Sequence, residues 1–193
     1  MAKKYLATER STRSYPTSLY AIAMLAVLYK MTGEALLADA ARGIDQELGF
    51  KGPAALHSDA ALTGLALIAA TDDDRDLSEA YYRELRRAPR AMRGGLLIST
   101  DRLLALLSRA TGRHGAAIRH FRRALRFSRA GFRPEMAWTL YDYAESLVCR
   151  GSHRHESRTT GLLRRSEEVA TDLGMVLLLR KIAVLRGGSI VQS

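Results

Sequence analysis

Glycine residues divide this sequence into segments that each have the apolar periodicity of an amphipathic helix. Such a segment precedes each of Gly33, Gly49, Gly112, Gly131, Gly151 and Gly174. Glycine adopts the left-handed conformation that ends many helices without steric cost, so these positions are predicted helix stops. No stretch shows the sustained apolar/polar alternation of a half-buried strand. The sequence therefore predicts an all-α fold.

The segments between the stops predict nine helices. They span about residues 17–31, 34–48, 54–71, 74–88, 92–110, 114–130, 134–150, 156–173 and 175–186. Pro134 fits the first turn of its helix, where no backbone N–H is needed, and the acidic "TDDD" at 71–74 fits the positive start of another. We expect about four helical hairpins followed by a terminal helix.

Two successive hairpins repeat at a similar spacing. Gly112 and Gly151 are 39 residues apart, and Gly131 and Gly174 are 43 residues apart. Stacked helix-pair repeats have periods of about 34 to 47 residues. We therefore expect an α-solenoid over residues 17–186, with a flexible basic segment at 1–16 and a flexible tail at 187–193.

The formal charge of +10 comes mostly from arginine. Such a charge either marks an anionic partner or reflects solvated basic faces. The single cysteine, Cys149, excludes an internal disulfide and fits a reducing compartment. The apolar run at 19–29 follows basic residues as in a signal peptide, but Lys30 ends it well short of the ~20 residues that span a bilayer. We expect a cytoplasmic protein without a membrane segment.

The segment 112–125, "GRHGAAIRHFRRAL", carries a more specific pattern. Gly112, Ala117, Phe121 and Ala124 match the spacing "G-x4-A-x3-F-x2-A" of the second half of a tetratricopeptide (TPR) repeat. Taken in order along the chain, the segments at 81–89, 103–125, 131–151 and 170–178 extend the match. Together they resemble the TPR-like C-terminal region of bacterial LuxR-type transcriptional activators and of multidomain adenylate or guanylate cyclases, in which an ATPase module precedes the helical tail. This resemblance implies a superhelical scaffold for protein contacts or for sensing an effector.

The catalytic parts of those proteins have no counterpart here. The sequence contains no "GxxxxGK[ST]" phosphate loop, and no cyclase domain fits in the remaining residues. The segment after Arg186 is too short for a LuxR-type helix-turn-helix. We expect a free-standing relative or a remnant of such a tail, without enzymatic activity and without a cofactor.

Two helices carry the residues that we expect to contact a partner. These candidates are Arg119, Arg122, Arg126, Trp138, Asp142 and Glu145. The arginines lie opposite the apolar face of Ala117 and Phe121, where they can neutralise phosphates or pair with the acidic residues of the next helix. Trp138 either packs on the next layer or is an exposed anchor, whereas Tyr143 belongs to an apolar face and is expected in the core.

Other polar residues are of the types found in metal or catalytic sites, but their spacing does not match such sites. Cys149, His153 and His155, with His114 and His120 one hairpin earlier, do not follow a usual structural zinc pattern. Asp142 and Glu145 are one turn apart, but no nucleophile or histidine accompanies them by spacing. The sequence therefore predicts neither a metal site nor a catalytic site.

These observations lead to two functional hypotheses. The first is a protein-interaction and regulatory module that binds another protein or its own copy. The second is a nucleic-acid-associated transcriptional regulator that uses the arginine face. A small effector bound between helical layers is a third idea, for which the sequence offers no specific residues.

Overall fold

The computed structural model describes residues 15–49, 58–87, 92–93, 98–128, 131–150 and 156–190. Residues 1–14 of the expected N-terminal segment lie outside the described residues, as do 191–193 of the expected tail. The last helix continues to Ile190 and so includes residues 187–190.

The described residues are almost entirely helical, which confirms the all-α class. The helices are α2 (Tyr15–Thr32), α3 (Ala35–Leu48), α4 (Asp59–Thr71), α5 (Arg75–Leu85), α6 (Thr100–Ala110), α7 (His114–Ser128), α8 (Arg133–Val148), α9 (Glu156–Asp172) and α10 (Val176–Ile190). Seven of them start and end within four residues of the predicted bounds, and α6 and α4 match only at their ends. For α4, the predicted first turn at 54–57 lies outside the described residues. None of the described helices is both long and apolar enough to cross a membrane.

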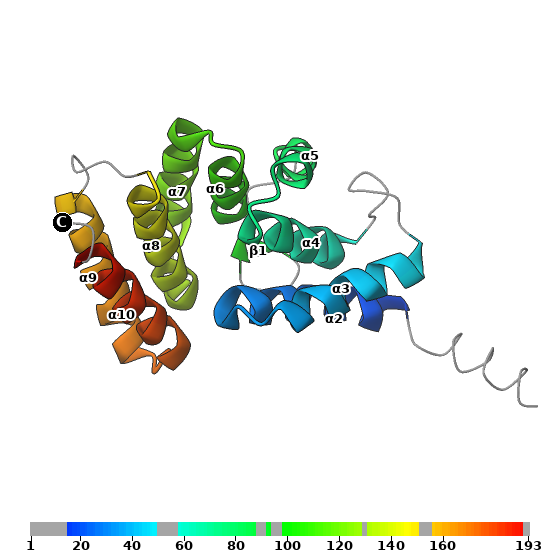
Figure 1. The fold of residues 1–193 in the computed structure, drawn as a ribbon, viewed down its shortest axis with the longest axis horizontal. Helices are drawn as coiled ribbons and strands as arrows, with labels where there is room; N and C mark the ends of the chain where they lie inside the picture. Colours follow the sequence, from blue (N-terminus) through cyan, green and yellow to red (C-terminus); the bar gives the residue numbers. More distant parts are fainter. Residues whose placement is uncertain are drawn as a thin grey trace, which may run out of the picture.

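Consecutive helices pack together as hairpins: α2 with α3, α4 with α5, α6 with α7 and α8 with α9. The hairpins follow one another through the molecule, because α4 contacts α2 and α6 while α7 contacts α8 (Figure 1). The terminal helix α10 packs on α9 and α8 and also reaches α2. The first and last described helices thus approach each other, so the stack curves back on itself.

The predicted helix stops coincide with real helix ends. Gly33, Gly49, Gly112, Gly131 and Gly174 all have positive φ, whereas Gly151 lies outside the described residues. At Gly49, with φ of 73°, the backbone N–H donates to the carbonyl oxygens of Asp45 and Gln46, which closes α3. The left-handed conformation at these positions explains why glycine occupies them.

The prediction of a helix over 92–110 is wrong in its first part. Met92–Arg93 (β1) and Ile98–Ser99 (β2) instead form a short antiparallel pair, with Met92 opposite Ser99. Helix α6 begins only at Thr100, because the hydroxyl of Ser99 accepts a hydrogen bond from the backbone N–H of Arg102 and caps the helix. The Gly-Gly pair at 94–95 also disfavours a helix through this segment.

The core lies along α4, α6 and α8, whose residues are the most completely buried. Gly64 of α4 lies directly against α2, since a Cβ there would be 2.8 Å from the Cα of Ala23. Farther along the stack, Phe121 of α7 stacks on Tyr143 of α8 with ring centroids 5.2 Å apart. The predicted core positions of Phe121 and Tyr143 are confirmed, with exposed fractions of 0% and 1%.

Candidate functional site

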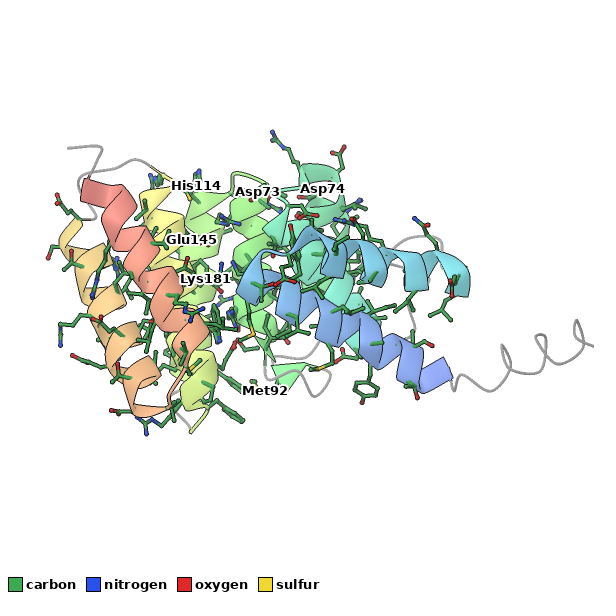
Figure 2. All side chains as sticks on the ribbon, turned by 60° about the horizontal axis from the view of Figure 1, so that its bottom comes forward. Asp73, Asp74, Met92, His114, Glu145 and Lys181 are labelled. Atoms are coloured by element: carbon green, nitrogen blue, oxygen red, sulfur yellow. The ribbon has the colours of Figure 1, made fainter. Side chains whose placement is uncertain are left out.

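Five charged side chains from three helices form a cluster between α2, α6 and α8. We call Lys30, Arg102, Glu135, Asp142 and Glu145 the buried charge cluster. Lys30 lies near the end of α2, Arg102 lies in the first turn of α6, and the three carboxylates come from α8. All except Glu145 are at least nine-tenths buried. In Figure 2, α2 and α10 lie at the front on either side of the labelled Glu145.

Asp142 is the centre of this cluster. Its Oδ2 accepts a hydrogen bond from Nε of Arg102 at 2.7 Å, and its Oδ1 lies 3.2 Å from Nζ of Lys30. The same arginine donates from Nη1 to Oε2 of Glu135 at 2.7 Å, and the same lysine lies 3.5 Å from Oε2 of Glu145. Each cation therefore bridges two carboxylates of α8 and ties its own helix to that face.

Burial and ion pairing move the pKa values of the two innermost carboxyls in opposite directions. Burial by itself would raise the pKa of Asp142, but the charges of Lys30 and Arg102 together outweigh it and lower the pKa. For Glu135, burial is the larger effect and raises the pKa despite Arg102 and the backbone N–H of Ser99. Arg102 itself is held in its charged form, because Asp142 and Glu135 raise its pKa against the effect of burial.

Neighbouring groups hold the carboxylates in place. The backbone N–H of Ser99, which caps α6, donates to Oε1 of Glu135 at 2.8 Å. The hydroxyl of Tyr141 donates to Oε1 of Glu145 at 2.9 Å. The guanidinium of Arg102 lies 5.7 Å from the ring centroid of Trp138, a favourable cation–π distance. These contacts make the cluster a fixed part of the fold rather than a mobile surface.

A pocket of about 170 Å³ adjoins the cluster where α2, α4, α6 and α8 meet. Its walls are mainly apolar and include Val27, Leu67 and Ile98. Lys30, Arg102 and Glu135 contribute the charged part of the wall, and each already has a partner within the protein. The pocket therefore offers space beside the cluster but no unpaired charge among these residues.

The structure places two of the candidate contact residues in the interior. Asp142 is fully buried and Trp138 is only 8% exposed, so neither presents a surface to a partner in this conformation. Trp138 packs edge-on against Tyr141 with ring centroids 6.1 Å apart, which is the packing alternative for this residue. Glu145 is part-buried and is engaged by Lys30 and Tyr141.

Pairing with the acidic residues of α8, one of the uses considered for the arginines of α7, does not occur within the described residues of this chain. Glu135 and Asp142 pair instead with Arg102 of α6 and, for Asp142, with Lys30 of α2. The reason is geometric, because α7 packs against the face of α8 that carries Tyr143 rather than the face that carries Asp142.

The arginines of α7 lie on a different surface, together with arginines of α9. Arg119, Arg122 and Arg126 are exposed, as expected from their position opposite Phe121. Two of them line a hollow of about 480 Å³ between α7 and α9, which we call the arginine groove. Its lining residues are Arg122, Leu125, Arg126, Tyr143, Arg158, Gly161, Leu162, Arg164 and Arg165. Arg119 is not among them.

Most guanidinium groups of this groove have no acidic partner. Arg164 pairs with Glu168 one turn further along α9. Within the described ranges, no carboxylate oxygen lies within 4.0 Å of Arg122, Arg126 or Arg165. Arg158 instead lies over the ring of Tyr143, 5.4 Å from its centroid. The arginine groove is thus a concentration of positive charge that the protein does not neutralise there.

Sequence reasoning found one wall of this groove and missed the other. Arg158, Leu162 and Arg165 occupy one face of α9 at the spacing i, i+4 and i+7, which is a readable helical signal. What the sequence lacks is the information that this face lies beside Arg122 and Arg126. That juxtaposition arises because α7 and α9 both pack on α8.

The histidines considered for a metal site have other surroundings. His153 and His155 lie outside the described residues, and His120 is buried between α5, α6 and α7. Its Nδ1 lies 2.9 Å from Oδ1 of Asp101, and its Nε2 lies 3.2 Å from the hydroxyl of Tyr82. Among the residues whose positions are given, no group of three or more histidine, cysteine and acidic side chains is arranged to hold a metal ion.

Comparison with known proteins adds no relative to this description. No protein-family model matches the chain, and no curated protein or solved structure shows significant similarity to it. The functional argument therefore depends on the residues and contacts of the chain itself.

Proposed function

We propose that this chain is a non-enzymatic, TPR-like helical-repeat module that binds a partner protein in a regulatory assembly. The observation that carries the proposal is the arginine groove, where several guanidinium groups on α7 and α9, two helices that both pack on α8, have no acidic partners. Unpaired like charges repel one another and destabilise a fold, so a binding role accounts for their position better than a structural one does. Repeat proteins commonly present such surfaces to other proteins.

The arrangement of the helices supports the TPR-like part of the proposal. Hairpins stack in order, and the residues of the TPR-like pattern, Ala117, Phe121 and Ala124, are buried against neighbouring helices. The period of about 40 residues is carried by the glycine stops at Gly131 and Gly174, which are 43 residues apart and both have positive φ. In a stack of this kind each hairpin contacts mainly its neighbours, which leaves an extended surface for a partner.

The proposal is tested by quantitative capture from the native host. The purified chain is immobilised and exposed to a nuclease-treated lysate, and an unrelated helical protein of the same net charge is treated in parallel. We expect at least one protein to be retained by this chain by about tenfold over the control, the ratio produced by a difference of ~1.4 kcal/mol in binding free energy. Equal retention by both baits would contradict the proposal, because it would show only nonspecific attraction to positive charge.

A second candidate function, binding of nucleic acid, is favoured by the exposed arginines of α7 and the net charge of +10. It predicts that the logarithm of the affinity for duplex DNA falls linearly with the logarithm of the salt concentration. The slope should become shallower in the variant R119A/R122A/R126A, in which three phosphate-binding groups are removed. No binding at low salt, or binding that ignores salt, would eliminate this candidate.

A further inference from the structure

We propose that the arginine groove binds a short acidic peptide segment of the partner protein, with its carboxylates at the guanidinium groups and an aliphatic side chain between the helices. The inference depends on the proposed protein-binding function and names the chemistry of the segment that is bound. It is carried by charge on both walls, an apolar floor and the burial of the groove's aromatic ring.

The charges stand on opposite walls of the groove. Arg122 and Arg126 of α7 are one helical turn apart, and Arg158 and Arg165 of α9 are two turns apart. A guanidinium presents two parallel N–H groups to a carboxylate and so recognises it with defined geometry. A segment lying between the helices therefore meets donors on both sides.

Two of the lining residues are aliphatic, and we call them the floor of the groove. Leu125 of α7 is partly buried, and Leu162 of α9 is 7% exposed. Gly161 widens the hollow next to them, because a Cβ at this position would meet nothing within 4 Å. An aliphatic side chain of a peptide gains free energy by leaving water here, whereas a sugar-phosphate backbone has no comparable group.

Two features favour a peptide over a nucleic acid. The aromatic ring of the groove, Tyr143, is 1% exposed and stacked on Phe121, so it offers no face for a nucleobase. A carboxylate adjoins the groove on α9, since Glu168 pairs with the lining residue Arg164. A long polyphosphate would be repelled by this group, while a short peptide needs the hollow of about 480 Å³ only for its anchoring side chains.

The test uses fluorescence anisotropy with two labelled synthetic peptides. One alternates glutamate and leucine over about eight residues, a length that an extended segment needs to cross two helix widths. The other replaces every glutamate with glutamine. We expect the full chain to bind the acidic peptide at physiological salt and the glutamine peptide at least about tenfold more weakly, because charge-assisted hydrogen bonds are lost.

The variant R122E/R165E changes one arginine on each wall. We expect it to weaken binding of the acidic peptide by more than about tenfold, since attraction becomes repulsion at both positions. The control is R123E, which makes the same Arg-to-Glu change at one exposed residue of α7 that does not line the groove. The affinity of this control for the acidic peptide should stay within about twofold of the wild-type value, because exposed charges outside the contact are screened by salt.

Several outcomes would overturn the inference. Equal binding by the wild type and R122E/R165E would place the acidic peptide elsewhere, and equal loss in R123E would reduce the effect to net charge. Tighter binding of a labelled single-stranded oligonucleotide, lost in R122E/R165E, would assign the groove to nucleic acid instead. Circular dichroism and urea unfolding of each variant show whether the fold is retained.

The same variants separate this inference from the proposed function. If a partner from the lysate is retained equally by the wild type and by R122E/R165E, protein binding stands and the groove is not its site. If no partner is retained and the acidic peptide still binds in a groove-dependent manner, the chemistry of the groove stands without the proposed function.

Discussion

The buried charge cluster and the arginine groove use the same residue type in opposite ways. Arg102 lies in the interior and donates to two carboxylates of α8, which keep it charged in spite of burial. Arg122 and Arg126 lie on the surface, and no described acidic group is within pairing distance of them. The guanidinium is identical in both places, but the number of acceptors around it differs.

This difference separates positions that hold the fold together from positions available for binding. A charge that is buried and fully paired is costly to disturb, because its partners lose their compensation at the same time. A charge that is exposed and unpaired contributes little to stability and is free to interact with another molecule. The cluster and the groove therefore predict variants with very different effects.

The largest expected effect is the removal of the central carboxylate in D142A. This variant leaves the buried cations Lys30 and Arg102 without one of their acceptors, and we expect a loss of about 3–5 kcal/mol in the free energy of unfolding measured with urea. The control E168A breaks the exposed pair with Arg164 and should change stability by less than about 1 kcal/mol. Similar small losses in both variants would remove the distinction between the two regions, and D142N provides a milder probe if D142A does not fold.

The second largest effect compares two glycines inside helices. In G64A the new methyl group would lie 2.8 Å from the Cα of Ala23, so α2 and α4 must separate, with an expected loss of about 1–3 kcal/mol. In G161A, beside the arginine groove, nothing lies within 4 Å, and the higher helix propensity of alanine should add about 0.5–1 kcal/mol. Thermal or urea unfolding measures both changes, and a gain of stability in G64A would contradict the close packing of α2 on α4.

The third effect concerns pH. Because the pKa of Asp142 is lowered in the folded state from its ordinary value of 3.8, the folded protein binds fewer protons there than the unfolded chain. The resulting stabilisation is fully present above the ordinary pKa and is lost as pH falls through the lower pKa of the folded state. The difference in unfolding free energy between the wild type and D142N, measured with urea over a series of acidic buffers, should therefore shrink on acidification. A difference that stays constant with pH would contradict this assignment.

The smallest expected effect is that of R126Q in the arginine groove. Removing an exposed, unpaired charge should change the free energy of unfolding by less than about 0.5 kcal/mol. Any change should be a gain at low salt that disappears as salt is raised, because it comes from relief of repulsion between like charges. A loss of more than about 1 kcal/mol would show that Arg126 has a structural partner and would weaken its assignment to a binding surface.

Local signals in the sequence were sufficient for most of the helices. The glycine stops at Gly49, Gly112 and Gly174 and the apolar face of Ala117 and Phe121 report on single segments, and the structure confirms them. The one wrong helix start, at 92, is informative because Met92–Arg93 pairs with Ile98–Ser99 as a short antiparallel ladder. Neither a repeated period nor an apolar face reveals such a short pairing.

The candidate site shows which contacts local sequence patterns do not predict. The sequence places Asp142 on the polar side of its helix and leaves open whether Trp138 is packed or exposed. In the structure, Lys30 and Arg102 come from helices far away in the sequence and lie against these two residues. In the same way, Arg158 and Arg165 form part of a groove only because packing places them beside Arg122 and Arg126. The residues that meet in these contacts are tens of positions apart in the sequence, so their contact produces no local periodic pattern.

The sequence by itself thus determined the all-α class, most of the helix ends and the concentration of arginine on one face of α7. Helix periodicity and glycine conformation are properties of a few neighbouring residues, which makes them readable without a structure. Only the tertiary structure decided which charges are paired in the interior and which remain open in the groove. The reason is that the free energy of a charge depends on the groups that packing brings around it, and the curvature of the helical stack sets those neighbours.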